Sequence, residues 1–138
     1  MGQQQLLLII LGVIIVGIAI AVGLQLFQSG SIGANQDAII NDMMNISAHA
    51  DQWRIRPESM GGGGGAFDGG TAGYQLPERM ATTGNATYTA TATGANTLDI
   101  VGTSSIHVGT VTLTYDADGT DDGARYDWGS TGVFDIES

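Results

Sequence analysis

The sequence predicts an α+β fold, in which a long N-terminal hydrophobic helix precedes a small head built on an antiparallel β-sheet. Three observations predict it. Residues 6–24 are all apolar or glycine. Apolar residues recur at helical spacing between residues 36 and 55. From about residue 86 the pattern changes to a period of two, which is typical of strands.

The composition excludes several classes of function. The chain has 138 residues, a formal net charge of −10 and four basic residues, all of them arginine. A nucleic-acid partner is not expected, because phosphate binding requires clustered Lys and Arg. Cysteine is absent, which excludes disulfides and thiol chemistry. His49 and His107 lie in different expected elements and no nucleophile-elbow motif is present, so we predict that the protein is not an enzyme.

Residues 1–28 form the first predicted segment, a helix for a membrane or a filament core. A membrane span needs about 20 apolar residues. Three interpretations compete: a secretory signal peptide, a permanent anchor, and a helix that leaves the membrane to pack in a fibre. A signal peptide is disfavoured, because no charged side chain precedes the apolar run. Gly12, Gly17 and Gly23 would allow close helix packing, although glycine is also common in membrane helices in general.

Residues 29–34 are predicted to be a weak point of this helix. Ser29, Gly30 and Gly33 come within a few residues of one another, and such clusters disfavour helix. We therefore expect the helix to be interrupted near residues 23–34.

Residues 35–138 are expected to form the globular head. An amphipathic helix is predicted over residues 36–55, and its apolar stripe should pack on the rest of the head. The stripe residues are Ile39, Met43, Ile46 and Trp53. A Gly-rich loop follows over residues 57–80, with five consecutive glycines at residues 61–65, and we expect it to be flexible or irregular.

The antiparallel β-sheet is expected over residues 86–137. Strand patterns cover residues 87–93, 98–101, 106–108 and 110–115, with a last strand near 124–128 or 133–136. Turn signals separate them at residues 94–96, 102–104 and 116–119.

Residues 5–21 are similar to the mature N-terminus of type IV pilins, a family that includes the pseudopilins of type II secretion. The similarity is specific for about the first 55 residues and only architectural for the head. It implies a pilin-like lollipop shape and a structural subunit of an extracellular helical filament on the cell surface. The subunit would be anchored in the inner membrane before assembly, would polymerise with copies of itself, and would be handled by prepilin-peptidase-type machinery. The expected filament-core residues are Gln5, Leu6, Ile9, Ile10, Gly12, Val13, Val16, Gly17, Ile20 and Gly23.

Two features depart from the pilin pattern. Pilins usually carry a glutamate at the fifth mature position, where this chain has Gln5. No basic leader precedes the apolar segment, and cleavage between Gly2 and Gln3 would move the glutamate position to Leu7. The alternatives are a pseudopilin of a secretion system and a single-span surface or periplasmic binding domain.

Two further groups of residues are candidate sites in the head. Asp116, Asp118 and Asp121 alternate around a glycine, as in loops that bind Ca²⁺, but the same sequence suits an acidic hairpin turn, which we favour. No other cofactor is expected. Asn45 and Asn85 begin N-x-S/T sequons and are candidate glycosylation sites.

Overall fold

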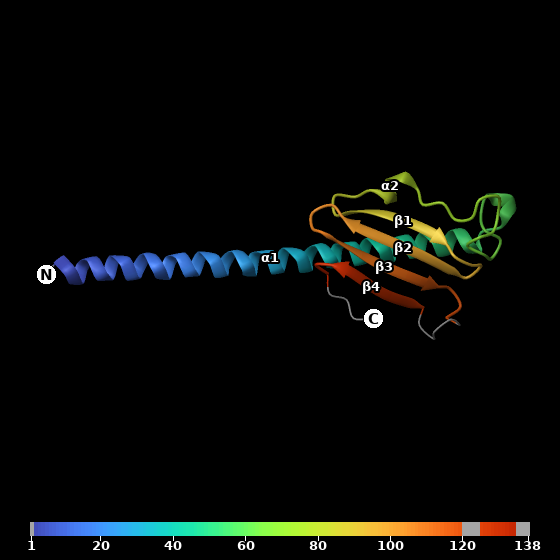
Figure 1. The fold of residues 1–138 in the computed structure, drawn as a ribbon. Coiled ribbons are helices and arrows are strands. Elements are labelled where there is room, and N and C mark those ends of the chain that lie inside the picture. Colours follow the sequence, from blue (N-terminus) through green and yellow to red (C-terminus); the bar gives the residue numbers. More distant parts are fainter. Residues whose placement is uncertain (1, 120–124, 135–138) are drawn as a thin grey trace. The chain divides into compact units, whose positions relative to one another are not determined.

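The computed structural model describes residues 2–119 and 125–134 (Figure 1). The chain divides into two compact units, one that ends at Gly33 and one that begins at Ala34. The element order is α1 (Gly2–Ile55), a 3-10 turn (Glu58–Met60), α2 (Glu78–Ala81), β1 (Ala86–Ala92), β2 (Thr97–Ser104), β3 (Gly109–Asp116) and β4 (Tyr126–Gly132). The long N-terminal helix followed by an antiparallel sheet confirms the predicted α+β class.

Helix α1 contains 54 residues without a break. The predicted interruption near residues 23–34 is therefore wrong, and Ser29, Gly30 and Gly33 are all helical. Each glycine costs a helix only about 1 kcal/mol, and no proline lies between residues 2 and 55 to remove a backbone hydrogen bond. Once a helix is nucleated, each added residue gains a hydrogen bond, so two separated glycines do not stop it.

The five-glycine run closes the C-terminal end of α1. The amide N–H of Gly63 donates to the carbonyl of Trp53 (3.0 Å), and that of Gly65 donates to the carbonyl of Arg54 (2.7 Å). Gly63 is buried, and a Cβ there would lie 2.1 Å from the carbonyl oxygen of Ala66. The predicted loop at residues 57–80 is irregular as expected, but part of it is packed and hydrogen-bonded to the helix end.

The four strands form one sheet in the order β1-β2-β3-β4, and each neighbouring pair is antiparallel (Figure 1). The predicted strand at residues 106–108 is wrong: these residues form the turn between β2 and β3. The hydroxyl oxygen of Ser104 accepts hydrogen bonds from the backbone N–H groups of Ile106 (3.2 Å) and His107 (3.0 Å). This side chain replaces a strand partner for the backbone, so the ladder ends there. The predicted turn at residues 102–104 is instead the end of β2.

The core of the head lies between the inner face of the sheet and the C-terminal part of α1 (Figure 1). Ile39, Met43 and Ile46 of the predicted stripe are buried, whereas Trp53 is half-buried. The inner face of the sheet supplies further buried residues: Leu98, Ile100, Val111 and Leu113. Phe67 and Tyr74 of the loop complete this core.

The outer face of the sheet is dominated by threonine. Alternate residues of each strand point away from the core, and none of the threonines among them is buried. They are Thr87, Thr89, Thr91, Thr97, Thr103, Thr110, Thr112, Thr114 and Thr131.

Candidate assembly surface

The N-terminal unit exposes a continuous apolar surface. Between Leu6 and Phe27, sixteen large apolar side chains are exposed, with exposed fractions of 48–75%. They are Leu6, Leu7, Leu8, Ile9, Ile10, Leu11, Val13, Ile14, Ile15, Val16, Ile18, Ile20, Val22, Leu24, Leu26 and Phe27. Residues 6–24 are all apolar or glycine and the first charged side chain of the chain is Asp37, so the segment is apolar around its whole circumference up to Leu24. A helix with this pattern is buried on all sides in its working environment.

This apolar surface is too large to be left in contact with water. Burying one large apolar side chain gains roughly 1.5–3 kcal/mol, so the sixteen together represent roughly 20–50 kcal/mol. The net stability of a domain is only about 5–15 kcal/mol. Helix α1 is long and apolar enough to cross a membrane, a property that N-terminal signal sequences share. The segment is therefore suited to a lipid bilayer or to a bundle of similar helices.

The three glycines of the segment lie open in the single chain. A Cβ added at Gly12, Gly17 or Gly23 would meet no atom within 4 Å. The predicted filament-core residues, from Gln5 to Gly23, are likewise all exposed. The chain by itself thus brings none of them into a packed site, and their role in packing stays a prediction.

A polar network that the sequence analysis missed links α1 to the first two strands. The Oδ2 atom of Asp42 accepts hydrogen bonds from the hydroxyl of Tyr88 (2.6 Å) and from that of Thr83 (3.2 Å). Near the start of the head, the Oδ1 atom of the buried Asn35 accepts the hydroxyl of Ser104 (2.7 Å). Asn35 and Asp42 are seven residues apart, which places both on the helix face of the core residues. Polar residues at core spacing were the signal available in the sequence.

A second cluster surrounds His49 at the other end of the head. The Nδ1 atom of His49 lies 2.9 Å from the hydroxyl of Tyr74, and the Tyr74 ring packs edge-on against Trp53. Burial, together with the positive charges of Arg79 and Arg56, lowers the pKa of His49. Burial raises the pKa of Tyr74 to about 12. Both side chains are therefore neutral at physiological pH and act as packing and hydrogen-bonding groups.

The candidate metal residues are only partly described. The amide N–H of Asp118 donates to Oδ1 of the buried Asp116 (3.1 Å), and the side-chain amide of Asn96 donates to Oδ2 of Asp118 (2.6 Å). Asp121 lies outside the described residues. Among residues 2–119 and 125–134, no three His, Cys, Asp or Glu side chains are grouped to hold a metal ion. Both interpretations of this segment, the favoured acidic turn and the calcium site, stay predictions.

The two sequons differ in their surroundings. Asn45 is exposed on α1. Asn85 is half-buried, and its side-chain amide donates to Asp42 at 3.5 Å. Asn45 is thus the more accessible of the two asparagines.

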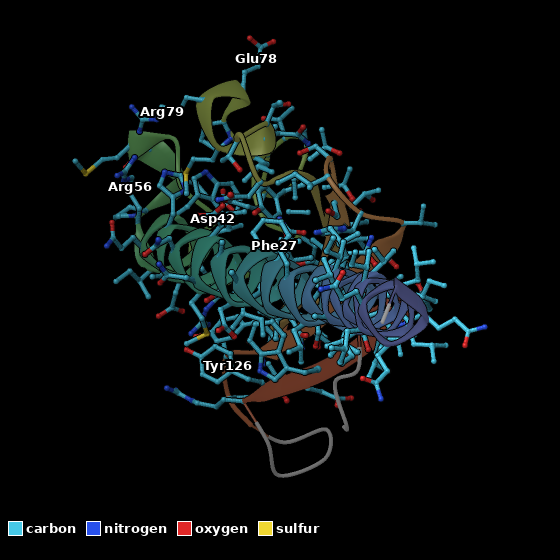
Figure 2. The ribbon with its side chains drawn as sticks, turned by 90° about the vertical axis from the view of Figure 1, so that its left-hand side faces the viewer. Phe27, Asp42, Arg56, Glu78, Arg79 and Tyr126 are labelled. Atoms are coloured by element: carbon cyan, nitrogen blue, oxygen red, sulfur yellow. The ribbon has the colours of Figure 1, made fainter. Side chains whose placement is uncertain are left out.

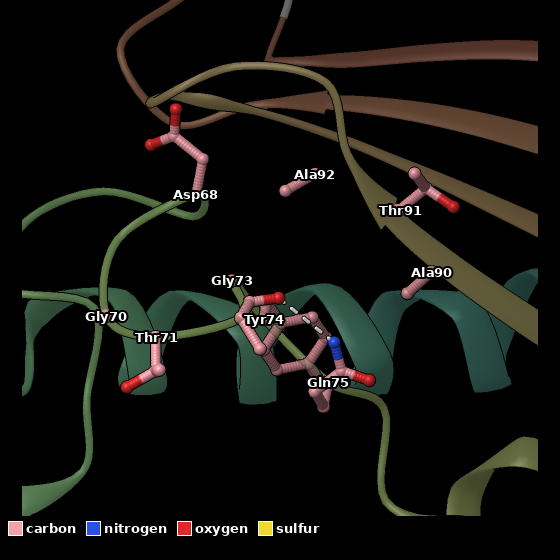
Figure 3. Close-up of a pocket in the computed structure, with 10 residues that line it drawn as sticks. Asp68, Gly70, Thr71, Gly73, Tyr74, Gln75, Ala90, Thr91 and Ala92 are labelled. Carbon is pink, nitrogen blue, oxygen red and sulfur yellow. Dashed lines mark hydrogen bonds between the residues drawn. The ribbon is translucent and has the colours of Figure 1, made fainter.

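A cavity of about 430 Å³ lies between the Gly-rich loop and the C-terminal half of β1 (Figure 3). Asp68, Thr71, Tyr74 and Gln75 line it from the loop, and the Gln75 amide donates to the carbonyl of Ala72 (3.1 Å). β1 lines it with Ala90, Thr91 and Ala92. Among the described residues that line the cavity, Asp68 is the one with a charged side chain.

The chain was compared with models of protein families, with curated proteins and with solved structures, and no match was found in any of the three.

Proposed function

We propose that this chain is a pilin-like structural subunit of an extracellular helical filament, which polymerises through its N-terminal apolar helix. One observation carries the proposal: residues 6–24 expose an uncharged apolar surface on every side, next to a folded acidic head. The similarity of residues 5–21 to the pilin N-terminus supports the same function.

Assembly would take two physical steps: the helix leaves the membrane and then packs against helices of other copies. The helix would first lie in the membrane, where its backbone hydrogen bonds are all internal. It would then move into a bundle of identical helices at the filament axis, where glycines at positions 12, 17 and 23 allow close approach. Head-to-tail contacts that do not close into a ring generate a helical polymer. The acidic heads would remain in water on the outside.

The second candidate function is a single-span anchor for a monomeric surface or periplasmic domain. It is favoured by the length and apolarity of α1, which suffice for one membrane crossing. A pseudopilin of a secretion system lies between the two, because it would assemble only into a short periplasmic polymer. These functions differ in whether the helices of several copies must pack together.

Microscopy of sheared cell surfaces tests the proposal. We expect uniform fibres that contain this chain and that disappear when its gene is deleted. If the protein remains entirely in the membrane fraction and no fibre contains it, the filament function is refuted and the anchor is favoured.

A pair of glycine variants separates packing from anchoring. Gly12→Leu/Gly17→Leu adds bulk where the single chain has open space, so the subunit itself can accept the change. We expect membrane insertion to be retained and the fibre yield to fall at least about ten-fold, because the leucines hold neighbouring helices apart. Val13→Leu/Val16→Leu, on the same segment, is the control and should assemble normally. Equal fibre yields from both variants would contradict close packing at the glycines.

A further inference from the structure

The four arginines of this acidic chain fall into two groups. Arg54 forms an ion pair with Asp51 (3.3 Å) and donates to the carbonyl of Gly65 (2.9 Å). Arg125 donates to the carbonyl of Ala117 (2.8 Å). Arg56 and Arg79, here called the basic pair, are exposed and form no ion pair with any group in residues 2–119 and 125–134. The head thus presents two cations that its described part does not use.

The basic pair lies on one side of the head. Arg56 directly follows α1 and Arg79 lies in α2, and Figure 2 shows both labelled side chains on the same side of the helix axis. Both are close enough to His49 to act on its charge. In the same view Glu78 points away from them. Both guanidinium groups are therefore open to carboxylates that approach this side of the head from outside the molecule.

The outer face of the sheet carries a matching set of carboxylates. Asp99 of β2 and Asp127 of β4, here called the acidic pair, both stand opposite Thr114 of β3 in the strand register. They lie in one row, two strands apart, which is roughly 10 Å. Asp127 is exposed and Asp99 is half-buried, with Thr114 donating to its Oδ1 atom (2.9 Å). On a face made mainly of threonine, this row is a distinct negative feature.

We propose that the basic pair of one copy binds the acidic pair of the next copy, and that this contact sets the register of the heads in the polymer. The inference rests on the proposed filament function. Each copy carries a charge of −10, so heads that meet at random positions repel one another. Opposing the two pairs replaces this repulsion by attraction at one defined position, which is how charge complementarity fixes orientation.

The positions of the two pairs make the contact open-ended. The acidic pair is on the sheet face that points away from α1, whereas the basic pair comes from the residue that follows α1 and from α2. Two different surfaces of the same chain thus meet, which gives a heterologous contact. Such a contact can repeat from copy to copy without closing, as a filament requires.

A two-chain experiment tests the contact. One chain carries Arg56→Asp/Arg79→Asp and the other carries Asp99→Arg/Asp127→Arg. In fibres of either variant alone, the two contacting surfaces would carry the same charge. We therefore expect the fibre yield of each variant to fall at least about ten-fold. Mixed in equal amounts, the two chains can alternate with every contact complementary, and the yield should return to within about two-fold of the native chain. This recovery also shows that both variants are folded.

A charge-matched pair of variants separates the contact from net charge. Arg56→Gln/Arg79→Gln and the control Thr71→Glu/Ala72→Glu both change the net charge from −10 to −12. Only the arginine variant should lose fibres. The inference is overturned if these two variants give equal fibre yields, or if mixing the two swapped chains does not restore the yield. In either case, fibres formed by the native chain would still support the filament function. The absence of fibres from the native chain would instead refute the filament function.

Discussion

The substitution Gly63→Ala tests the packing of the five-glycine run. A Cβ at this position would lie 2.1 Å from the carbonyl oxygen of Ala66 and 2.6 Å from Cζ3 of Trp53. Backbone and ring must both shift, and overpacking of this kind costs about 1–3 kcal/mol. The shift also strains the hydrogen bond from the Gly63 N–H to the Trp53 carbonyl (3.0 Å), and leaving a buried group unpaired costs about 1–3 kcal/mol.

The expected loss is therefore roughly 2–6 kcal/mol in the free energy of unfolding. For a head of this size, that corresponds to a fall in Tm of roughly 10–30 °C. The assay is thermal unfolding of the full chain in detergent, followed by the near-ultraviolet circular dichroism of its aromatic side chains. Gly84→Ala is the matched control, because a Cβ there meets no atom within 4 Å. If both variants melt within about 2 °C of each other, the glycine run is not packed against the helix end and the reasoning fails.

Two further predictions concern the polar clusters of the head. Tyr88→Phe removes the 2.6 Å hydrogen bond to Asp42 and should lower the free energy of unfolding by about 1.5–3 kcal/mol in urea, whereas Tyr126→Phe, on an exposed side chain, should change it little. An equal effect of the two tyrosine variants would contradict a role for this bond. The lowered pKa of His49 means that the unfolded chain binds a proton more readily than the folded chain, so stability is full above about pH 6.5 and falls as the pH drops below it. The variant His49→Gln should flatten this dependence in urea titrations across that range, and an unchanged slope would show that another group is responsible.

The elements with a regular period were predictable because their signal is local. The alternation in β1 and β3 and the helical stripe from Ile39 to Ile46 mark which residues face the core. Those of the stripe and the apolar ones of β3 are buried, as are the first two of β1. The sequence pattern predicted the wrong position for the turn between β2 and β3. Ile106 and Val108 have strand-like side chains, but the hydroxyl of Ser104 binds the backbone of the turn. Side-chain competition for backbone groups is not visible in the hydrophobic pattern.

The features that were missed depend on contacts between distant parts of the chain. The glycine run looks like a flexible loop in isolation, and only the carbonyls at the end of α1 show what it binds. Asp42 and Tyr88 are 46 residues apart, so no local rule pairs them. The apolar segment was predicted from its composition, and in the single chain its large side chains remain exposed. The candidate assembly surface was therefore predictable as a surface, and not as a packed site.

The continuity of α1 has a mechanical consequence. Because one helix runs through the boundary after Gly33, tension applied to the N-terminal segment reaches the head along a single backbone. The first side chain to resist inside the head is Asn35, which is tied to Ser104 of β2. Ile39, Met43 and Ile46 then have to leave the core together if the helix is to slide past the sheet. At the far end, the glycine run holds the last carbonyls of the helix, so pulling strains bonds at both ends of the head at once.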